Sequence, residues 1–478
     1  MWLTVAERRA GLEPLVVGID LGTSEAKAIA ISADGRLVGI GRAGYATDLG
    51  PDGRAEQDPA TWWTAVAAAV RLLGVDAADV AAICGVAQGP TLAAVDAVGD
   101  ALRPAITWQD RRVRAAGFGF LPSMTWLART EPDTVARAAW LLPACDALGL
   151  WLTGVPATST QAHDSGPDAA SLAEAGVLPG KVPPGRPFGS PLGVLRSGAA
   201  AALGLRPGTP VVTGVNDGAA SMLGAGLRHA GDAVDTGGTS GGLAIYADHA
   251  VAVPGLYCAP APLPGRWAVG GAMAALGASL DWLRGAVLGD RWTIDELFAA
   301  AAAVPAGAGG VTFLPYLAGE RAPVFDETAR GAFVGLGLEH GRGHLVRAVL
   351  EGAAYAMRSV AEPLAVAGAP IGELRLAGRT TPGDLWGQIK ADVLGVPTAV
   401  PLVGETAVLG AAILAASGSG AAIGLAEAVA AMTAVARRLE PNPAVSDRHA
   451  AGYATYLALY PALRGSRQGL ERQDEAPG

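Results

Sequence analysis

Two short turns in this sequence combine glycine with hydroxyl residues, a pattern that favours phosphate binding. Glycine lets backbone N–H groups approach an anion closely, and threonine and serine add hydroxyl donors. The residues concerned are Gly22, Thr23, Ser24, Gly238, Thr239 and Ser240. One such turn alone indicates no more than a hairpin. Two matched turns, one in each half of the chain, favour a site that holds the phosphates of a nucleotide from both sides of a cleft.

Charged residues beside the first turn extend this interpretation. Asp20 lies just before the turn, and we expect it to hold Mg²⁺ through water because hard oxygen ligands suit that ion. Lys27 follows the turn and would neutralise charge on a phosphoryl group during its transfer. The sequence therefore predicts ATP and Mg²⁺ as cofactors, with a purely structural hairpin as the alternative.

The segments around both turns predict β-hairpins. Residues 15–44 contain apolar, partly β-branched runs separated by turn residues at 21–23 and 34–35, which indicates three strands. Residues 232–247 repeat the design with an apolar strand, a glycine-rich turn and a second apolar strand. Such self-similarity suggests an internal duplication.

The rest of the chain alternates predicted helices and short strands, which indicates α/β sheets with helices on their faces. A helix should begin at Asp58-Pro59, and residues 165–191 should be irregular because they are rich in glycine and proline. With a boundary near Arg228–Asp232, each half receives one Gly-Thr-Ser hairpin. The expected organisation is an N-terminal domain of residues 14–228, a C-terminal domain of residues 229–465 and a disordered tail of residues 466–478.

Composition excludes several classes of partner. The 478 residues carry a net charge of −9 and no dense run of lysine and arginine, which argues against binding to nucleic acid or to an anionic membrane. Only 5% of residues are aromatic although 51% are hydrophobic, so the cores must consist mainly of alanine, valine and leucine. The three cysteines form no C-x-x-C pair, which indicates neither a disulfide framework nor a zinc site.

One uncharged segment, residues 407–425, has the length of a membrane span. It is rich in alanine, glycine and serine and contains a Gly-Ser-Gly break, so we expect a buried helix, a turn and a second helix instead. The first residues are charged and lack an apolar core, so no secretory signal is visible. A cytoplasmic location is the default expectation.

Beyond these local patterns, a series of motifs resembles the FGGY carbohydrate kinases of the actin-like ATPase superfamily, and most of all the xylulokinases. The resemblance runs from about Val16 to Gly418, and the motifs fall in the family's order. They include RPAITWQDRR at 103–112, TGVNDGAASMLGAG at 213–226, GGTSGG at 237–242, FLPYLAGERAPVFDETARG at 313–331 and GAFVGLGLEHGRGHLVRAVLE at 331–351. Many ordered motifs are specific where a single one would not be.

The resemblance implies a two-domain α/β fold of the actin-like, ribonuclease H-like type with a central cleft. It implies ATP-dependent phosphorylation of a hydroxyl group of a small sugar or polyol, such as the ketopentose xylulose, and it is compatible with a homodimer. Asp217 matches the catalytic base, with capping of the following helix as its structural alternative. The other nucleotide-contacting positions are Gly277, Asp281, Gly378, Arg379 and Thr380, and the sugar-side positions are Gln88, Gly89, Pro90, Trp108, Asp110, Arg111 and Asp217.

Further expectations concern three groups of residues. Asp110 and Arg111 would otherwise form a structural ion pair that closes the lobe. Asp281 would repel phosphate, so we expect it to face ribose or solvent. Glu320 and Arg321, in the Gly-Glu-Arg segment, should form a structural ion pair.

Three departures from the family pattern bear on the substrate. Gly89-Pro90 stands where xylulokinases carry Met-His and glycerol kinases Arg-Glu, so no side chain there can hydrogen-bond the acceptor. Arg379-Thr380 replaces glycines in the adenosine loop, which changes how closely a nucleotide can approach. The link after Arg112 is shorter than in the family, which indicates a trimmed first lobe.

Two other function classes stay open at this point. A sugar or nucleotide sensor with weak catalysis would explain the altered adenosine loop, while the retained Asp20, Thr239 and Asp217 oppose it. A chaperone-type actin-like ATPase is opposed by the lack of a peptide-binding domain after the second lobe. The sequence names neither the acceptor nor the preferred nucleotide.

Overall fold

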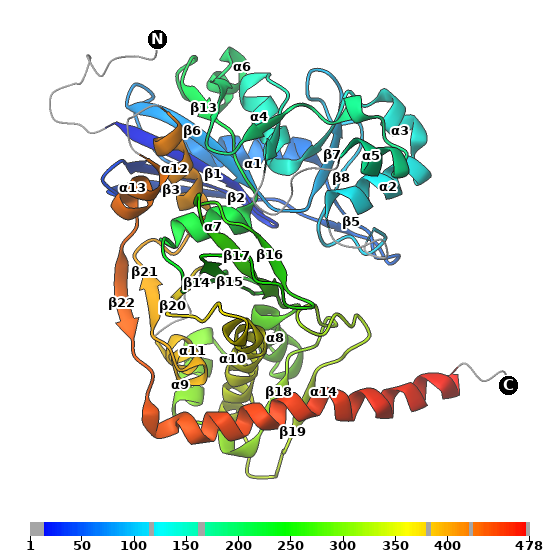
Figure 1. Ribbon diagram of the computed structural model, residues 1–478, viewed down its shortest axis with the longest axis vertical. Coiled ribbons are helices and arrows are strands. Elements are labelled where there is room, and N and C mark those ends of the chain that lie inside the picture. The colour runs from blue at the N-terminus through cyan, green and yellow to red at the C-terminus, as the bar shows by residue number, and fades with distance from the viewer. Residues whose placement is uncertain (1–13, 114–118, 161–167, 379–383, 420–423, 475–478) are drawn as a thin grey trace. The chain divides into compact units, whose positions relative to one another are not determined.

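The computed structural model describes residues 14–113, 119–160, 168–378, 384–419 and 424–474 (Figure 1). The chain forms two compact units. Unit 1 comprises Met1–Gly226 with Glu405–Ala434, and unit 2 comprises Leu227–Gly404 with Val435–Gly478. The expected domain limits were continuous in sequence. The compact units differ from them because residues 405–434 pack within unit 1.

Unit 1 is built on a six-stranded mixed sheet in the order β12-β13-β6-β1-β2-β3. The bounds are β1 (Leu15–Leu21), β2 (Glu25–Ser32), β3 (Leu37–Gly44), β6 (Val80–Ala87), β12 (Pro191–Val194) and β13 (Pro210–Val212). The strands β1, β2 and β3 are consecutive and antiparallel, as the sequence predicts, whereas β6 runs parallel to β1 and β13 parallel to β6.

Helices cover this sheet, namely α1 (Pro59–Arg71), α4 (Ala144–Thr153), α6 (Ser197–Leu203), α7 (Asp217–Gly224), α12 (Thr406–Gly418) and α13 (Leu425–Met432). The predicted start of α1 is confirmed, because Asp58 caps the helix by accepting the N–H of Ala60. Val17 and Ile19 of β1 belong to one core cluster with residues of α1, α4 and α6. Gly18, on the opposite face of β1, lies against α12, where a β-carbon would be 2.2 Å from the carbonyl oxygen of Val408.

The helix α12 and the following α13 account for the uncharged segment. Residues 408–416 of α12 are buried, which confirms a buried helix followed by a second helix, although the connecting residues 420–423 lie outside the described part. Among the described residues, no helix is both long and apolar enough to cross a membrane.

A second, antiparallel sheet in unit 1 has the order β4-β5-β8-β7-β9. Its strands are β4 (Asp48–Leu49), β5 (Ala55–Gln57), β7 (Leu92–Val95), β8 (Ala105–Ile106) and β9 (Trp140–Pro143), and it packs with α2 (Phe120–Thr130) and α3 (Pro132–Arg137). The region 165–191, expected to be irregular, contains α5 (Ala169–Glu174), the 3₁₀ turn Pro179–Lys181 and β11 (Gly185–Pro187), which pairs with β10 (Thr158–Thr160).

Unit 2 repeats the strand arrangement of unit 1 in a seven-stranded sheet of order β16-β17-β15-β14-β20-β21-β22. The bounds are β14 (Asp232–Asp235), β15 (Gly242–Ala247), β16 (Tyr257–Pro260), β17 (Trp267–Ala272), β20 (Glu373–Leu376), β21 (Thr398–Pro401) and β22 (Val435–Leu439). Three antiparallel strands, β14, β15 and β17, are again followed by parallel neighbours, β20 and β21. The internal duplication suggested by the two turns therefore appears in the strand order.

The remaining elements of unit 2 are α8 (Leu276–Trp282), the π-helical turn Leu283–Val287, α9 (Ile294–Ala302), β18 (Thr312–Leu314), β19 (Ala332–Val334), α10 (Arg342–Val366), α11 (Leu385–Leu394) and α14 (Ser446–Asp474). Residues of α10, α9 and α14 share one hydrophobic core with the sheet. The helix α14 continues through 466–474, where we expected a disordered tail. This stretch contains arginine, glutamine, leucine and glutamate, which favour helices.

Candidate active site

Three chain segments of unit 1 meet at the carboxyl ends of the parallel strands, the edge at which α/β proteins bind ligands. The first phosphate turn follows β1, the segment Gln88–Pro90 follows β6, and the segment with Asn216 and Asp217 follows β13. The N–H of Gln88 donates to the carbonyl of Leu21 at 2.8 Å, and Ala87 forms a β-bridge with Asn216. The structure thus brings the phosphate turn, the predicted sugar segment and Asp217 to one sheet edge.

Asp20 is a buried carboxylate without full hydrogen bonding. It shares the face of β1 that is turned toward α12, since it lies two residues after Gly18. Its side chain is only 4% exposed, and its Oδ1 has no hydrogen-bond partner among the described residues. Burial raises the pKa of Asp20 to about 7, helped by the nearby charges of Asp217 and Glu405 and opposed by Lys27.

Lys27 lies directly across from Asp20 in the β1–β2 register. Its Nζ is 3.0 Å from Oε2 of Glu405, whose other oxygen binds Arg42. Burial alone would lower the pKa of Lys27, but the charges of Asp20 and Glu405 outweigh it and raise this pKa. Glu405 shows the reverse balance, because Lys27 and Arg42 lower its pKa against the effect of burial. No pattern around the turn pointed to Glu405, which lies far from the turn along the chain.

Asp217 occupies the first position of α7. The helix cap is the preceding Asn216, whose Oδ1 accepts the N–H of Ala219 at 2.7 Å. Asp217 itself accepts the N–H of Gly218 at 2.8 Å, and the capping role considered for Asp217 belongs to its neighbour. Burial raises the pKa of Asp217 to about 6. This half-buried carboxyl group therefore has a proton affinity suited to a general base near neutral pH.

On the sugar side, the structure places Gln88, Gly89 and Trp108 close to these groups. A β-carbon on Gly89 would lie 3.4 Å from Cβ of Asn216, so this segment lies beside the start of α7. The indole N–H of Trp108 donates to Oγ1 of Thr23 at 3.0 Å, which links the predicted sugar face to the phosphate turn. Pro90 is partly exposed next to Gly89.

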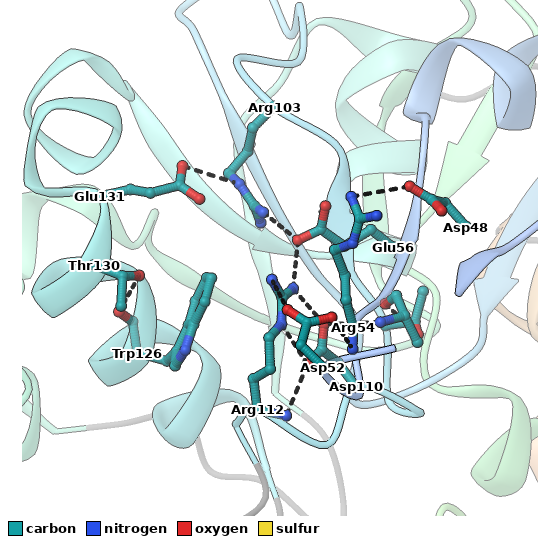
Figure 2. Close-up of polar contacts among 12 residues, drawn as sticks. Asp48, Asp52, Arg54, Glu56, Arg103, Asp110, Arg112, Trp126, Thr130 and Glu131 are labelled. Carbon is teal, nitrogen blue, oxygen red and sulfur yellow. Dashed lines mark hydrogen bonds and ion pairs between the residues drawn. The ribbon is translucent and has the colours of Figure 1, made fainter. Parts of the chain in front are cut away.

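Asp110 pairs with Arg112 and not with Arg111 (Figure 2). Both oxygens of Asp110 bind protein donors: Oδ1 accepts from Nε of Arg112 at 3.0 Å, and Oδ2 accepts from the N–H of Ala55 at 3.0 Å. Its side chain is fully buried, whereas Arg111 is exposed. This geometry favours the structural alternative for Asp110, with Arg112 as the partner.

The Asp110–Arg112 pair is part of a larger network at the second sheet of unit 1. The Oε1 atom of Glu56 is 2.5 Å from both Arg103 and Arg112, and Arg103 also binds Glu131 (Figure 2). The guanidinium carbon of Arg112 lies 4.5 Å from the ring centre of Trp126. This network fixes the loop that carries Trp108.

In unit 2, the second phosphate turn is fixed by its own contacts. The carboxylate of Asp235, at the end of β14, accepts the N–H of Gly237 at 2.9 Å and binds Nζ of Lys390 at 2.5 Å. Lys390 also lies 4.3 Å from the ring centre of Trp386. At the tip of the turn, Gly238 and Thr239 remain exposed.

The structure brings Gly277 and Gly378 to this second turn. A β-carbon on Gly277 would be 2.2 Å from the carbonyl oxygen of Gly238, so only glycine fits there. Gly378 has a φ of +84° and packs against Gly237. Asp281 lies exposed on α8, and the predicted positions Arg379 and Thr380 lie outside the described residues.

The Gly-Glu-Arg segment of unit 2 contains a second buried acid. Oε1 of Glu320 accepts the N–H groups of Ala274 and Arg321, while its Oε2 has no partner among the described residues. Burial raises the pKa of Glu320 to about 7. The contact between Glu320 and Arg321 thus includes a backbone hydrogen bond in addition to the charge attraction that we expected.

Comparisons with known proteins agree with these features. Residues 15–117 match the N-terminal domain, and residues 233–419 the C-terminal domain, of the FGGY family of carbohydrate kinases. The chain is 32% identical to the xylulose kinase of Escherichia coli over 417 residues, covering 80% of this chain and 85% of the relative. It is 31% identical to the glycerol kinase of Gloeobacter violaceus over 461 residues, covering 87% and 91% of the two chains.

The fold also matches solved structures. The crystal structure of the xylulose kinase from Rhodospirillum rubrum superposes with a TM-score of 0.81 at 31% identity, over 94% of this chain and 99% of that one. The two mixed sheets with their repeated strand order are thus those of the two-domain, actin-like α/β fold that the sequence predicted. The chain belongs to the FGGY family of carbohydrate kinases, ATP-dependent phosphotransferases that act on an alcohol group.

Proposed function

We propose that this protein transfers the γ-phosphoryl group of ATP to a hydroxyl group of a ketose or alditol, with a pentulose such as xylulose as the first candidate. The observation that carries this proposal is the position of Asp217 at the carboxyl edge of the parallel strands, beside the first phosphate turn and Asp20. A carboxylate there can accept the proton of an incoming alcohol. The elevated pKa of about 6 makes it a stronger base than an exposed aspartate.

In this reaction the acceptor oxygen attacks the γ-phosphorus, the bond to the β-phosphate oxygen breaks, and ADP leaves. The hydroxyl proton passes to Asp217, a step that contributes about 10²–10⁴-fold to the rate. Lys27 neutralises charge on the transferred group, held in place by Glu405. The amides and hydroxyls of Gly22, Thr23 and Ser24 bind phosphate in unit 1, and those of Gly238, Thr239 and Ser240 do so in unit 2, with Gly277 and Gly378 at the nucleotide.

Mg²⁺ fits the donors at Asp20. The Oδ1 atom of Asp20 is buried without a partner, and a hard carboxylate oxygen is the ligand type that Mg²⁺ prefers. The described residues contain no cluster of three or more histidine, cysteine or acidic side chains that could hold a metal on their own. We therefore propose that Asp20 holds the ion together with water and phosphate oxygens. The ion supplies charge stabilisation for the phosphates when it is bound.

The acceptor stays the open part of the proposal. Relatives of similar identity are named for xylulose and for glycerol. The Gly89-Pro90 segment offers no side-chain donor, so hydroxyl recognition has to come from neighbours such as Gln88 and Trp108. The predicted cytoplasmic location and homodimer are left as predictions.

The test is ADP release from ATP and Mg²⁺ across a panel of ketoses and alditols, with Asp217→Asn as the control. We expect one pentulose or polyol to raise ADP release at least about 100-fold above the variant. If no acceptor does so, and the protein nevertheless binds an acceptor tightly, the kinase proposal is replaced by the sensor. ATP hydrolysis that no acceptor changes would favour the chaperone-type ATPase.

A further inference from the structure

A buried glutamine, Gln57, connects the two parts of the unit 1 site. It ends β5 and is 1% exposed. Its Oε1 accepts the indole N–H of Trp62 at 2.9 Å and Nε2 of Gln88 at 2.7 Å. Its Nε2 donates to the carbonyl of Thr23 and to Oγ1 of Thr47, both at 2.7 Å. One amide therefore contacts the phosphate turn on one side and the sugar segment on the other.

The chemistry of the partners fixes which way this amide points. An indole nitrogen only donates, so the Gln57 atom that faces Trp62 must be the oxygen. A backbone carbonyl only accepts, so the atom that faces Thr23 must be the nitrogen. Both ends give the same orientation. Gln88 therefore faces an oxygen of Gln57 and must present its own Nε2 to it.

This constraint leaves the other atom of Gln88, Oε1, without a partner. Gln88 is 2% exposed, and its Oε1 has no hydrogen bond among the described residues. A buried acceptor without a donor is unfavourable and uncommon in folded proteins. Gln88 begins the segment that lies beside Asn216 and the proposed base Asp217. The unsatisfied oxygen therefore belongs to a side chain at the edge where the acceptor has to bind.

We propose that Oε1 of Gln88 accepts a hydrogen bond from one hydroxyl group of the acceptor substrate. Gln57, held by Trp62, is the positioning residue that fixes which atom of Gln88 faces the substrate. We call this hydrogen-bonded chain of Trp62, Gln57 and Gln88 the relay. The inference rests on the proposed function and deepens it, because it states what the acceptor must offer at this point. The ligand must bring an O–H donor. A carbonyl, ether or fluorine at the same position can only accept and is rejected.

The test uses isothermal titration calorimetry of acceptor binding without nucleotide. The probes are xylulose, glycerol and the other ketoses and alditols of the panel, followed by the monodeoxy and monofluorodeoxy derivatives of the tightest binder. For the unaltered protein, we expect one position at which both derivatives bind about tenfold more weakly or worse. In Gln88→Leu, the derivatives at that position should bind as tightly as the parent sugar, while the losses of affinity at the other positions stay the same.

The positioning role of Gln57 has its own readout. In Gln57→Met the side chain keeps its length but no longer accepts from Gln88, so the Gln88 amide can rotate and present Nε2 to the ligand. The fluorodeoxy derivative at the critical position should then regain binding relative to the parent sugar. A merely structural defect would weaken all ligands alike. Trp63→Phe is the matched control, because Trp63 packs against Trp151 outside the relay and its change should leave every penalty in place.

The outcomes separate the two proposals. Acceptor binding without ADP release overturns the proposed function. The relay is then judged from the affinities of the deoxy and fluorodeoxy derivatives alone. Equal penalties in the unaltered protein and Gln88→Leu overturn the relay alone, and no binding by any hydroxylated acceptor overturns both. If Gln57→Met does not fold, Gln57→Glu takes its place. The carboxylate of this variant still accepts from Gln88, so the preference for a hydroxyl donor should persist. Loss of that preference in Gln57→Glu would refute the relay.

Discussion

The two units place an aspartate at corresponding points, but the two aspartates differ in their hydrogen-bond partners. Asp20 precedes the first phosphate turn and Asp235 the second, each at the end of the first strand of its antiparallel set. Asp20 is buried with one oxygen unpaired. Asp235 is equally buried, but its two oxygens bind Gly237 and Lys390. The same sequence pattern thus yields an open carboxylate in unit 1 and a closed ion pair in unit 2.

This difference in hydrogen bonding indicates that Asp20 is available to a ligand, whereas Asp235 stabilises the structure. Leaving a buried carboxylate unsatisfied destabilises the fold, and such groups cluster where function requires them. A buried ion pair satisfies its own charges and fixes the backbone around it. We infer that Asp20 serves the chemistry, whereas Asp235 holds the shape of a turn whose exposed tip does the binding.

The largest expected effect on activity comes from Asp20→Asn. The change removes the proposed Mg²⁺ ligand, so kcat should fall about 10²–10³-fold. The melting temperature should not fall, because the substitution removes a buried charge without a full set of partners. Steady-state ADP release and thermal unfolding measure the two quantities. Full activity in the variant would refute the assignment of Asp20.

Lys390→Met should show the opposite pattern in unit 2. Removing one partner leaves Asp235 charged and buried, and this destabilises the protein by about 3–5 kcal/mol. The double variant Asp235→Asn, Lys390→Met should recover most of that loss, since no buried charge is left. Urea unfolding followed by circular dichroism tests both variants. A double variant as unstable as the single one would show that Lys390 acts by packing rather than by charge.

Glu405→Gln would make the first site resemble the second. Lys27 loses the nearer of its two ion-pair partners and keeps Glu25, at 3.7 Å, and Asp20, which lies directly across the β1–β2 register. A lysine paired with Asp20 competes with Mg²⁺, so the Mg²⁺ concentration for half-maximal ADP release should rise roughly tenfold, the size of one charge-assisted hydrogen bond. Arg438→Gln is a suitable control, because its pair with Glu373 lies in unit 2. An unchanged Mg²⁺ requirement would argue against this competition.

An effect on the pH dependence of stability is expected at Glu320, the buried acid of unit 2 whose Oε2 has no partner among the described residues. Its pKa of about 7 in the folded protein exceeds the ordinary value of 4.5, so the folded form holds the proton more tightly than the unfolded chain. The resulting stability is fully present below about pH 4.5 and is lost as the pH rises through 7. Glu320→Gln cannot ionise, so its free energy of unfolding should fall about 1–3 kcal/mol less than that of the unaltered protein between pH 5 and 8. Parallel pH profiles from urea unfolding would contradict this expectation.

Local patterns were sufficient for many of the elements. The three strands of residues 15–44, the Asp58-capped start of α1 and the two helices after residue 405 depend on neighbouring residues, so the sequence predicted them. The return of residues 405–434 to unit 1 was missed, because no local pattern states which of two sheets a buried helix will cover. The helical backbone of 466–474 was missed as well, since polar composition alone does not exclude a helix.

The candidate site divides in the same way. The glycine turns, Asp20 and Lys27 were predicted from residue types and spacing, and Asp217 and Gln88 from ordered motifs, and their roles in the site stay predictions. Arg112, Gln57, Glu405 and Lys390 were not found, because each acts on a residue distant in sequence.

By itself, the sequence determined the hairpins, the family and the residue types that can hold phosphate and accept a proton, because these depend on short-range patterns of backbone freedom and side-chain chemistry. The tertiary structure alone decided which carboxylate remains unpaired, which amide orients Gln88 and which lysine closes the second turn. Burial and hydrogen-bond polarity are set by atoms that only folding brings together, so spacing along the chain does not contain them.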